Sequence, residues 1–301
     1  MTTVAGESRV AYALANGMQL CYETFGDPAD PPLVLVMGLA TQMIVWDEEF
    51  CTMLAAHGFH VVRFDNRDIG LSTKLLHART PGLPELVLAQ ATGLRFRVPY
   101  TLRDMATDTV GLLDALGIAA AHVVGASMGG MIAQEIALAY PSRVRTLTSI
   151  MSSTGDRKLP RARPRALAVL ARRIPHDREG YIRAYVDTWH VLAGDNFPFD
   201  AAYWARQGAA SYARGINPGG AARQLLAIVA SGSRKARLRG LAVPALVIHG
   251  TADPLIPVEH GLDTARTIPG AKLMLIEGMG HSFPREVWPR IIDAIAQHAS
   301  A

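Results

Sequence analysis

Short apolar runs alternate with helix-like segments along this chain, and this alternation limits the possible folds more than any other feature of the sequence. The runs are LVLVM (33–37), HVVRFD (60–65), AHVVGA (121–126) and VRTLTSI (144–150). Continuous apolar runs of this length are typical of strands buried on both faces. Helices are predicted between them, at about 44–58, 102–117 and 127–140. This order predicts an α/β fold with a mostly parallel sheet, helices on both faces, and ligands beyond the carboxyl ends of the strands.

The pattern changes between residues 155 and 235, where Arg- and Ala-rich helix-like segments are broken by prolines and no buried strand is evident. The alternation resumes with ALVIHG (245–250), a helix after Pro257, KLMLIEG (272–278) and an amphipathic helix over 284–298. We therefore predict a core formed by residues 1–154 and 236–301, with a helical insertion at 155–235. A hairpin around Asn16 and Gly17 is expected to open the core.

Composition places the chain among globular proteins, because half of its 301 residues are hydrophobic and only 19% are charged. The opening MTTVAGESRV has neither the basic start nor the apolar stretch of a signal peptide, and no later segment is apolar enough for a membrane span. We predict a soluble, cytoplasmic protein with no membrane partner. Cys21 and Cys51 lie in apolar contexts and are expected to be buried free thiols.

Basic residues are concentrated in one part of the chain. Residues 156–239 hold 16 Lys and Arg against 6 Asp and Glu, although the whole chain carries a net charge of only +4. A solvated basic surface explains this, and attraction of an anionic substrate or partner is the alternative. No nucleic-acid-binding module accompanies the charge, so no nucleic-acid partner is predicted.

The sequence Gly125-Ala126-Ser127-Met128-Gly129 lies where a predicted buried strand turns directly into a helix. A serine on such a sharp turn is held out of the sheet toward substrate, and the two glycines leave room for the backbone segments that cross there. Ser127 is therefore the predicted nucleophile. The N–H of Met128, at the positive end of the following helix, is a predicted oxyanion donor.

A serine hydroxyl needs a base to take its proton, and His281 has the best position for that role. It lies in GMGHSF, a glycine-flanked loop between the last predicted strand and the last helix. Two other histidines fall in or beside strand runs and are expected to be packed: His122 and His249. The remaining ones occur in helical, loop or surface contexts: His57, His60, His77, His176, His190, His260 and His298.

Asp253 is the predicted partner of the histidine, because it follows the penultimate strand in HGTADPLIP. The order Ser127, Asp253, His281 is the serine, acid, histidine order of a nucleophile-elbow hydrolase. Two other acidic residues, Glu259 and Asp263, fall in the next predicted helix and are expected to lie on its solvated face.

A second oxyanion donor is expected from the loop after the strand at 33–37, and we assign it to the N–H of Leu39. Gly38 alone is also compatible with a purely structural turn. The segment FDNRDIGLS (64–72) clusters Asp65, Arg67 and Asp68 at another strand exit. We interpret it as a structural loop whose charges pair with the backbone and with each other. No motif has the spacing of a metal site or of a phosphate or dinucleotide loop, so no cofactor and no metal are predicted.

These motifs resemble those of the α/β-hydrolase superfamily, with GASMGG as nucleophile elbow, HGTADPLIP as acid loop and GMGHSF as histidine loop. Within the superfamily, the chain looks most like the branch of aclacinomycin methylesterase and related actinobacterial lipase/esterase-like hydrolases. Three segments carry this resemblance: GDPADPPLVLVMG, RFDNRDIGLST and HVVGASMGGMIAQEIAL. Met37-Gly38 stands where many superfamily members have His-Gly, and that branch is similar in having Met-Gly. The resemblance implies an eight-stranded, mostly parallel sheet with a helical cap at about 155–235, inserted after the sixth strand.

The resemblance also implies a carboxylic-ester hydrolase that works through an acyl-enzyme on Ser127, with methyl esters as one possible substrate class. The same triad supports lactone or thioester hydrolysis, acyl transfer or cofactor-free perhydrolysis. A ligand-binding receptor with the hydrolase fold is the alternative from another class. The expected partner is a small-molecule ester, and the sequence leaves open a monomer or a homodimer. Cap aromatics are candidates for the pocket, with core packing as the alternative: Trp189, Phe197, Tyr203 and Trp204.

Overall fold

A computed structural model describes residues 10–78, 97–194 and 196–300, so nearly all of the opening segment used to judge a signal peptide lies outside the described residues. Eight strands form one sheet: β1 (Ala11–Ala15), β2 (Met18–Phe25), β3 (Pro32–Val36), β4 (His60–Phe64), β5 (Ala121–Ala126), β6 (Val144–Ile150), β7 (Ala245–Gly250) and β8 (Lys272–Ile276). Their order is β1-β2-β4-β3-β5-β6-β7-β8. β1 and β2 pair antiparallel, β2 pairs antiparallel with β4, and the other neighbours are parallel. The predicted mostly parallel sheet of eight strands is confirmed.

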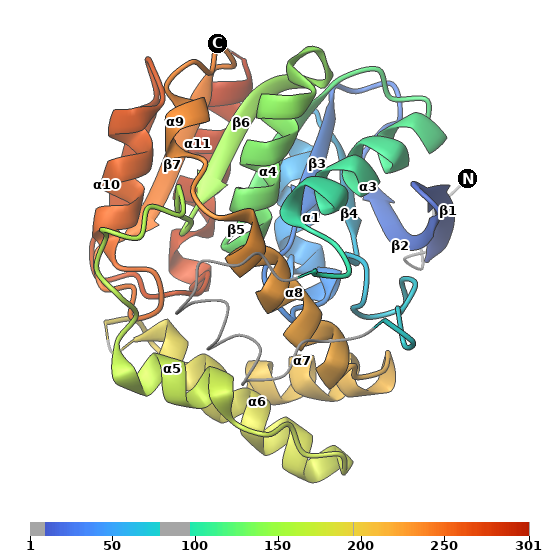
Figure 1. The fold of residues 1–301 in the computed structure, drawn as a ribbon, viewed down its shortest axis with the longest axis vertical. Helices are drawn as coiled ribbons and strands as arrows, with labels where there is room; N and C mark the ends of the chain where they lie inside the picture. The colour runs from blue at the N-terminus through green and yellow to red at the C-terminus, as the bar shows by residue number, and fades with distance from the viewer. Residues whose placement is uncertain (1–9, 79–96, 195, 301) are drawn as a thin grey trace.

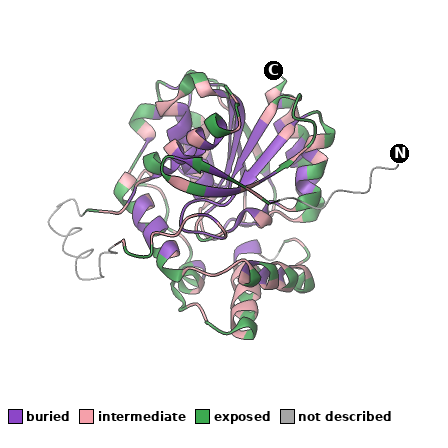
Figure 2. Ribbon diagram, turned by 90° about the vertical axis from the view of Figure 1, so that its right-hand side faces the viewer, coloured by how far each residue is buried: buried purple, intermediate pink, exposed green. Residues whose placement is uncertain are grey.

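Both faces of the central strands are buried, because successive residues of such a strand enter two separate apolar clusters. On β3, Val34 and Val36 belong to one cluster, whereas Leu33 and Leu35 belong to the other. The first cluster takes in α3 (Leu102–Ala115) and α4 (Met128–Ala139), and the second takes in α1 (Glu48–Ala56) and α11 (Trp288–Ala299). Figure 2 shows the buried residues concentrated in the strands and on the helix faces that pack against them.

The first helix begins later than the predicted 44–58. Residues Met43–Val45 form a short 3-10 turn, η1, and α1 starts after Asp47, whose side chain accepts the N–H of Glu49. An aspartate in this position satisfies one of the unpaired N–H groups of a first helical turn. The cap residue therefore fixes the start of α1, and apolar periodicity alone places it too early. The described part of the core also contains η2 (Pro141–Arg143), α10 (Val258–Thr267) and η3 (Arg285–Val287).

Among the described residues, the helices between β6 and β7 are α5 (Pro164–Ala171), α6 (Arg178–Ala193), α7 (Ala201–Ala213), α8 (Pro218–Ser231) and the short α9 (Lys235–Leu238). We call α5 to α8 the cap. Figure 1 shows α5, α6 and α7 beyond the end of the sheet at which the parallel strands finish, with α8 running back from them along the core. The cap therefore covers the edge at which function was expected.

Several basic residues of this region pair with acidic residues of the core instead of forming a free basic surface. The pairs are Arg214 with Asp65, Arg223 with Asp68, Lys235 with Asp263, and Arg237 with Glu135. Part of the local excess of positive charge is thus used to fasten the insertion to the core. Within the three described stretches of chain, no helix combines the length and the apolarity needed to cross a membrane. Cys21 and Cys51 are buried free thiols, as predicted.

His122 on β5 makes folding sensitive to acid. Its side chain is buried, with Nδ1 2.9 Å from Thr146 Oγ1, and burial lowers its pKa to about 4. An unfolded histidine titrates near pH ~6.5, so between pH ~6.5 and 4 the unfolded state binds a proton that the folded state does not. The stabilising contribution of neutral His122 is complete above that range and is lost as the pH falls through it.

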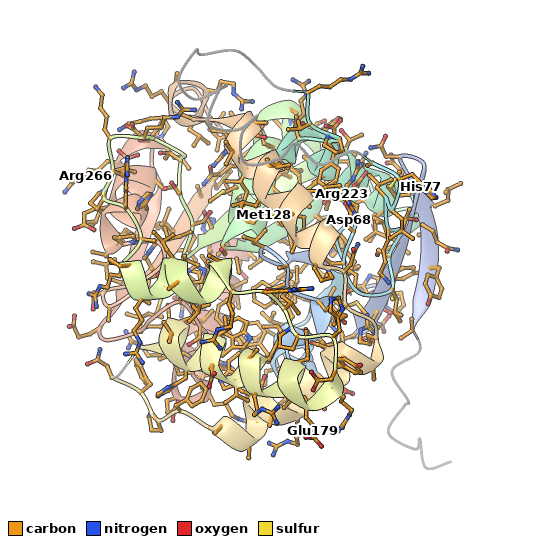
Figure 3. The ribbon with its side chains drawn as sticks, turned by 60° about the horizontal axis from the view of Figure 1, so that its bottom comes forward. Asp68, His77, Met128, Glu179, Arg223 and Arg266 are labelled. Carbon is orange, nitrogen blue, oxygen red and sulfur yellow. The ribbon has the colours of Figure 1, made fainter. Side chains whose placement is uncertain are left out.

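We therefore expect the free energy of unfolding to fall between pH 7 and pH 4.5, and His122→Gln to reduce that fall by roughly 1 to 3 kcal/mol. Urea unfolding at a series of pH values measures it. His77, which is exposed (Figure 3), supplies the control variant His77→Gln. A pH dependence that is the same in both variants would contradict the assignment. Burial also lowers the pKa of His249 and of His298, so His122→Gln retains part of the dependence.

Candidate active site

Ser127 occupies the sharp turn between β5 and α4. Its backbone has φ 56° and ψ −121°, a conformation that non-glycine residues rarely adopt, and its side chain is partly exposed. The turn is held from both sides, because Ser127 N–H donates to Ile150 O at 2.9 Å and Ser127 O accepts from Ser152 Oγ at 2.7 Å. Strain that the surroundings enforce in this way is typical of functional positions.

Glycine is required on both sides of the serine. A Cβ on Gly125 would lie 2.2 Å from Gly129 O, and a Cβ on Gly129 would lie 2.0 Å from Val36 O. The helix that follows Ser127 therefore approaches β3 and β5 more closely than any side chain allows. The two glycines occur where the sequence analysis expected crowding of the backbone.

The structure brings the three predicted side chains together. His281 Nε2 is 3.0 Å from Ser127 Oγ, and His281 Nδ1 is 2.7 Å from Asp253 Oδ2. The carboxylate accepts the Nδ1 proton, which leaves the Nε2 lone pair free to accept the serine proton. His281 and Asp253 are 5% and 3% exposed, so water weakens these contacts little.

Each partner of the serine is fixed by its own loop. Asp253 follows β7, and its Oδ1 accepts the N–H groups of Leu255 and Ile256, both at 2.8 Å. His281 follows β8, and its backbone N–H donates to Leu192 O at the end of cap helix α6, at 2.7 Å. The sequence gives no indication of this hydrogen bond between His281 and Leu192, because the two residues are almost 90 positions apart in the chain.

The two predicted oxyanion donors lie next to the serine. Met128 is the first residue of α4, and the Gly38 backbone passes so close to Ser127 that a Cβ there would be 3.6 Å from Ser127 Oγ. Leu39 follows Gly38 directly. Across residues 10–78, 97–194 and 196–300, the N–H groups of Leu39 and Met128 donate no hydrogen bond to another protein group.

His249 lies beside the acid and is one histidine that the sequence analysis expected to be packed. Its ring is fully buried, its Nε2 is 2.8 Å from Ile256 O and 3.6 Å from Asp253 Oδ2, and burial lowers its pKa. It is therefore a neutral neighbour of Asp253. Asp263, in contrast, does not lie on a solvated helix face as predicted. It is partly buried and accepts hydrogen bonds from Thr154 Oγ1 and Lys235 Nζ, whereas Glu259 is exposed as expected.

The charges of the loop at 64–72 do not pair with each other as predicted. Each pairs with a residue from outside the loop: Asp65 with Arg214 just after α7, Arg67 with Asp108 of α3, and Asp68 with Arg223 of α8. The carboxylates also accept backbone N–H groups of Met43, Leu71 and Leu75, which agrees with the other half of the prediction. Burial opposes the charge of Asp68, but hydrogen bonds from Arg223, from the Leu75 N–H and from Tyr100 outweigh it and hold its pKa below the usual range. The loop fastens the cap to the core.

Aromatic side chains of the cap and the core meet around a small cavity. Its lining includes Trp189, Tyr203 and Trp204 from the cap, and Trp46, Phe50, Phe283 and Trp288 from the core. Trp189 and Trp204 stack with ring centroids 4.2 Å apart and an interplanar angle of 11°. Three of the four cap aromatics proposed for a pocket thus line a cavity, while Phe197 packs against the neighbouring apolar cluster. The triad side chains are not part of this lining. No cluster of His, Cys, Asp or Glu with metal-ligand geometry occurs in the described residues.

Comparison with known proteins agrees with this architecture. The family described as "alpha/beta hydrolase fold" matches residues 31–284. The rhodomycin D methylesterases DauP of Streptomyces sp. (strain C5) and DnrP of Streptomyces peucetius are each 31% identical to the chain over 314 aligned positions, covering 93% of this chain and 94% of the relative. The meta-cleavage product hydrolase CumD of Pseudomonas fluorescens IP01 has a similar structure, with a TM-score of 0.74 at 20% identity, covering 96% of this chain and 97% of its own. The chain therefore belongs to the alpha/beta hydrolase fold family, as its motifs had indicated.

Proposed function

We propose that the protein is a serine carboxylic-ester hydrolase in which Ser127 is the nucleophile, His281 the general base and Asp253 the residue that orients the histidine. The observation that carries this proposal is the continuous line of contacts from Ser127 Oγ through His281 to Asp253, at 3.0 and 2.7 Å. A hydroxyl, a correctly oriented imidazole and a buried carboxylate in this order activate a serine for acyl transfer. The shared family and the methylesterase relatives support the same chemistry.

In the first half-reaction, Ser127 Oγ attacks the ester carbonyl carbon while its proton moves to His281 Nε2. The carbonyl oxygen becomes negative and accepts the N–H groups of Leu39 and Met128. The C–O bond to the alcohol then breaks, and His281 returns its proton to the departing alcohol oxygen. An acyl-enzyme on Ser127 remains. Water then attacks the acyl carbon while His281 Nε2 takes its proton. The bond from the acyl carbon to Ser127 Oγ breaks, His281 returns the proton to Oγ, and the carboxylic acid leaves.

A small-molecule methyl ester is the substrate class that we favour, because two relatives of nearly the same length are named methylesterases. Lactones, thioesters, acyl transfer and perhydrolysis use the same three side chains, and no contact in the site favours one of them. An aspartate in place of Ser127 would be needed for the carboxylate-nucleophile chemistry of dehalogenases and epoxide hydrolases, so that chemistry is not proposed.

Turnover and covalent labelling together test the proposal. We expect the protein to hydrolyse p-nitrophenyl acetate or butyrate, and a fluorophosphonate probe to stop this turnover by forming an adduct on Ser127, located by peptide mass spectrometry. A panel of methyl esters with bulky acyl groups then defines the substrate class. An adduct on another residue would contradict the assigned nucleophile, and a protein inert toward every ester and the probe would favour the receptor alternative.

A further inference from the structure

Residues 37–41, which we call the oxyanion loop, are held by side chains from other parts of the chain. At the start of the loop, Asn66 Nδ2 donates to Met37 O at 2.9 Å. At its end, the Ala40 N–H donates to Gln224 Oε1, also at 2.9 Å. Gln224 belongs to cap helix α8 and is fully buried, although it is 184 residues away in the chain. The cap therefore reaches the loop that carries the proposed oxyanion donor Leu39.

The peptide unit between Leu39 and Ala40 is bonded at both of its polar atoms. Its carbonyl, Leu39 O, accepts from Thr41 Oγ1 at 2.8 Å, and its N–H is the one that Gln224 accepts. Ala40 has φ 57°, a left-handed conformation that is strained for a non-glycine residue. Without the contact to Gln224, the loop is free to relax from this conformation. The Leu39 N–H, one residue earlier, belongs to a peptide unit that is then held only by the long hydrogen bond from Thr41 N–H to Gly38 O, at 3.4 Å.

The orientation of the Gln224 amide follows from its partners. The Ala40 N–H can only donate and the Arg67 carbonyl can only accept, so Oε1 faces Ala40 while Nε2 donates to Arg67 O at 2.9 Å. Both ends of the side chain are used. A side chain locked in this way transmits the position of its own helix to the loop that it contacts.

Helix α8 is itself firmly placed against the loop at 64–72. Arg223 donates to both carboxylate oxygens of Asp68, at 2.8 and 2.6 Å, and the two side chains lie side by side where α8 passes the core (Figure 3). A Cβ on Gly220 would lie 2.3 Å from Asp68 O, so the helix backbone and the loop are in direct contact. Gln224 is therefore carried by a helix that the core holds in place.

We propose that Gln224 is a positioning residue for the oxyanion site, through which the cap holds the Leu39 N–H in the direction that the reaction needs. This inference rests on the proposed function, because it assigns Gln224 a role in stabilising the tetrahedral oxyanion. Gln224 does not touch the reacting atoms. It acts through the Ala40 N–H and the Leu39–Ala40 peptide unit.

Gln224→Met tests this directly, because methionine has a similar shape and lacks both hydrogen bonds. A displacement of about 1 Å in a catalytic group can cost about 100-fold in rate. We expect kcat for p-nitrophenyl butyrate to fall about 10- to 100-fold, KM to stay within about threefold, and fluorophosphonate labelling to slow by a factor similar to that of kcat. Substrate binding in the ground state makes no use of a negative oxygen, so a loss confined to KM would overturn the proposal.

Gln42→Met is the matched control. Gln42 is also a buried glutamine that joins core and cap, since its Nε2 donates to Ser211 O and Gly215 O, but it makes no hydrogen bond to the oxyanion loop. We expect it to lower the melting temperature without lowering kcat by more than about threefold. Equal losses of kcat in both variants would show a general loosening of the cap, and the proposal would be wrong.

If Gln224→Met does not fold, Gln224→Glu tests whether residue 224 positions the Leu39 N–H. A neutral carboxylic acid can accept from Ala40 N–H and donate to Arg67 O, and burial raises the pKa of a carboxyl group. The charged groups around it are the Arg67–Asp108 and Arg223–Asp68 pairs. We expect the rate relative to wild type to fall as the pH rises, because the ionised carboxylate can no longer donate to Arg67 O and the side chain loses one of the two hydrogen bonds that fix it. A ratio that stays near one after the acid has ionised would overturn the proposal.

Ser127→Ala separates this inference from the function on which it rests. If the wild type hydrolyses esters and Ser127→Ala does not, full activity of Gln224→Met would refute the positioning role alone. If Ser127→Ala remains as active as the wild type, both the proposed function and the role of Gln224 are refuted.

Discussion

Replacing Ser127 with alanine is expected to lower kcat for p-nitrophenyl butyrate by about 10⁴-fold or more and to abolish fluorophosphonate labelling. Without the hydroxyl no acyl-enzyme forms, and only the oxyanion donors and substrate binding remain to speed attack by water. The fold should not change, because the only hydrogen bond that Ser127 Oγ makes in the described chain is with His281. Circular dichroism and the melting temperature check that the fold is retained, and steady-state turnover measures the fall in kcat.

The chain offers a matched control in a second contact between a serine and a histidine. Ser153 Oγ is 2.7 Å from His260 Nδ1, but the other ring nitrogen faces the carbonyl of Pro160 at 2.9 Å instead of a carboxylate. Ser153 also lies outside the strained turn that presents Ser127. Ser153→Ala should therefore keep kcat within about twofold. If it lost activity as Ser127→Ala does, proximity to a histidine would not be what distinguishes the nucleophile.

Local sequence was enough to predict the strands, because the information that defines a buried strand is local. The bounds of β5, β6 and β7 coincide with the apolar runs 121–126, 144–150 and 245–250. The start of α1 was missed because Asp47 caps the helix and η1 precedes it, and a capping side chain outweighs apolar periodicity. The apolar pattern therefore predicts the bounds of buried strands, but it misplaces a helix start by a few residues where a capping side chain sets that start.

The candidate site was predictable in part, for a related reason. Ser127, Asp253 and His281 each follow a predicted strand, and the carboxyl ends of parallel strands meet at one edge of a sheet. Their convergence therefore needed only the strand pattern and the chain order. The cap contacts had no comparable signal. Residues 156–239 contain many arginines in similar sequence contexts. The residues around Arg223 give no indication that this arginine is the one that pairs with Asp68.

Asp253→Asn is expected to reduce kcat by about 10³- to 10⁴-fold, although it changes one oxygen into a nitrogen. Asp253 Oδ1 accepts two backbone N–H groups, so the amide oxygen of asparagine must occupy that position. Its NH₂ group then faces His281 Nδ1 and donates to it. The ring must carry its proton on Nε2, and in this tautomer it cannot accept the proton of Ser127.

The expected result is thus a folded protein that binds ester with little change in KM and turns it over slowly. Steady-state kinetics with p-nitrophenyl butyrate measure both, and the slow step should appear in fluorophosphonate labelling as well, because that reaction also needs the serine proton removed. Glu259→Gln removes an exposed carboxylate from the same region and should leave kcat within about twofold. An Asp253→Asn variant that retained wild-type kcat would mean that the acid does not set the tautomer of His281, and the role assigned to it would have to pass to another group.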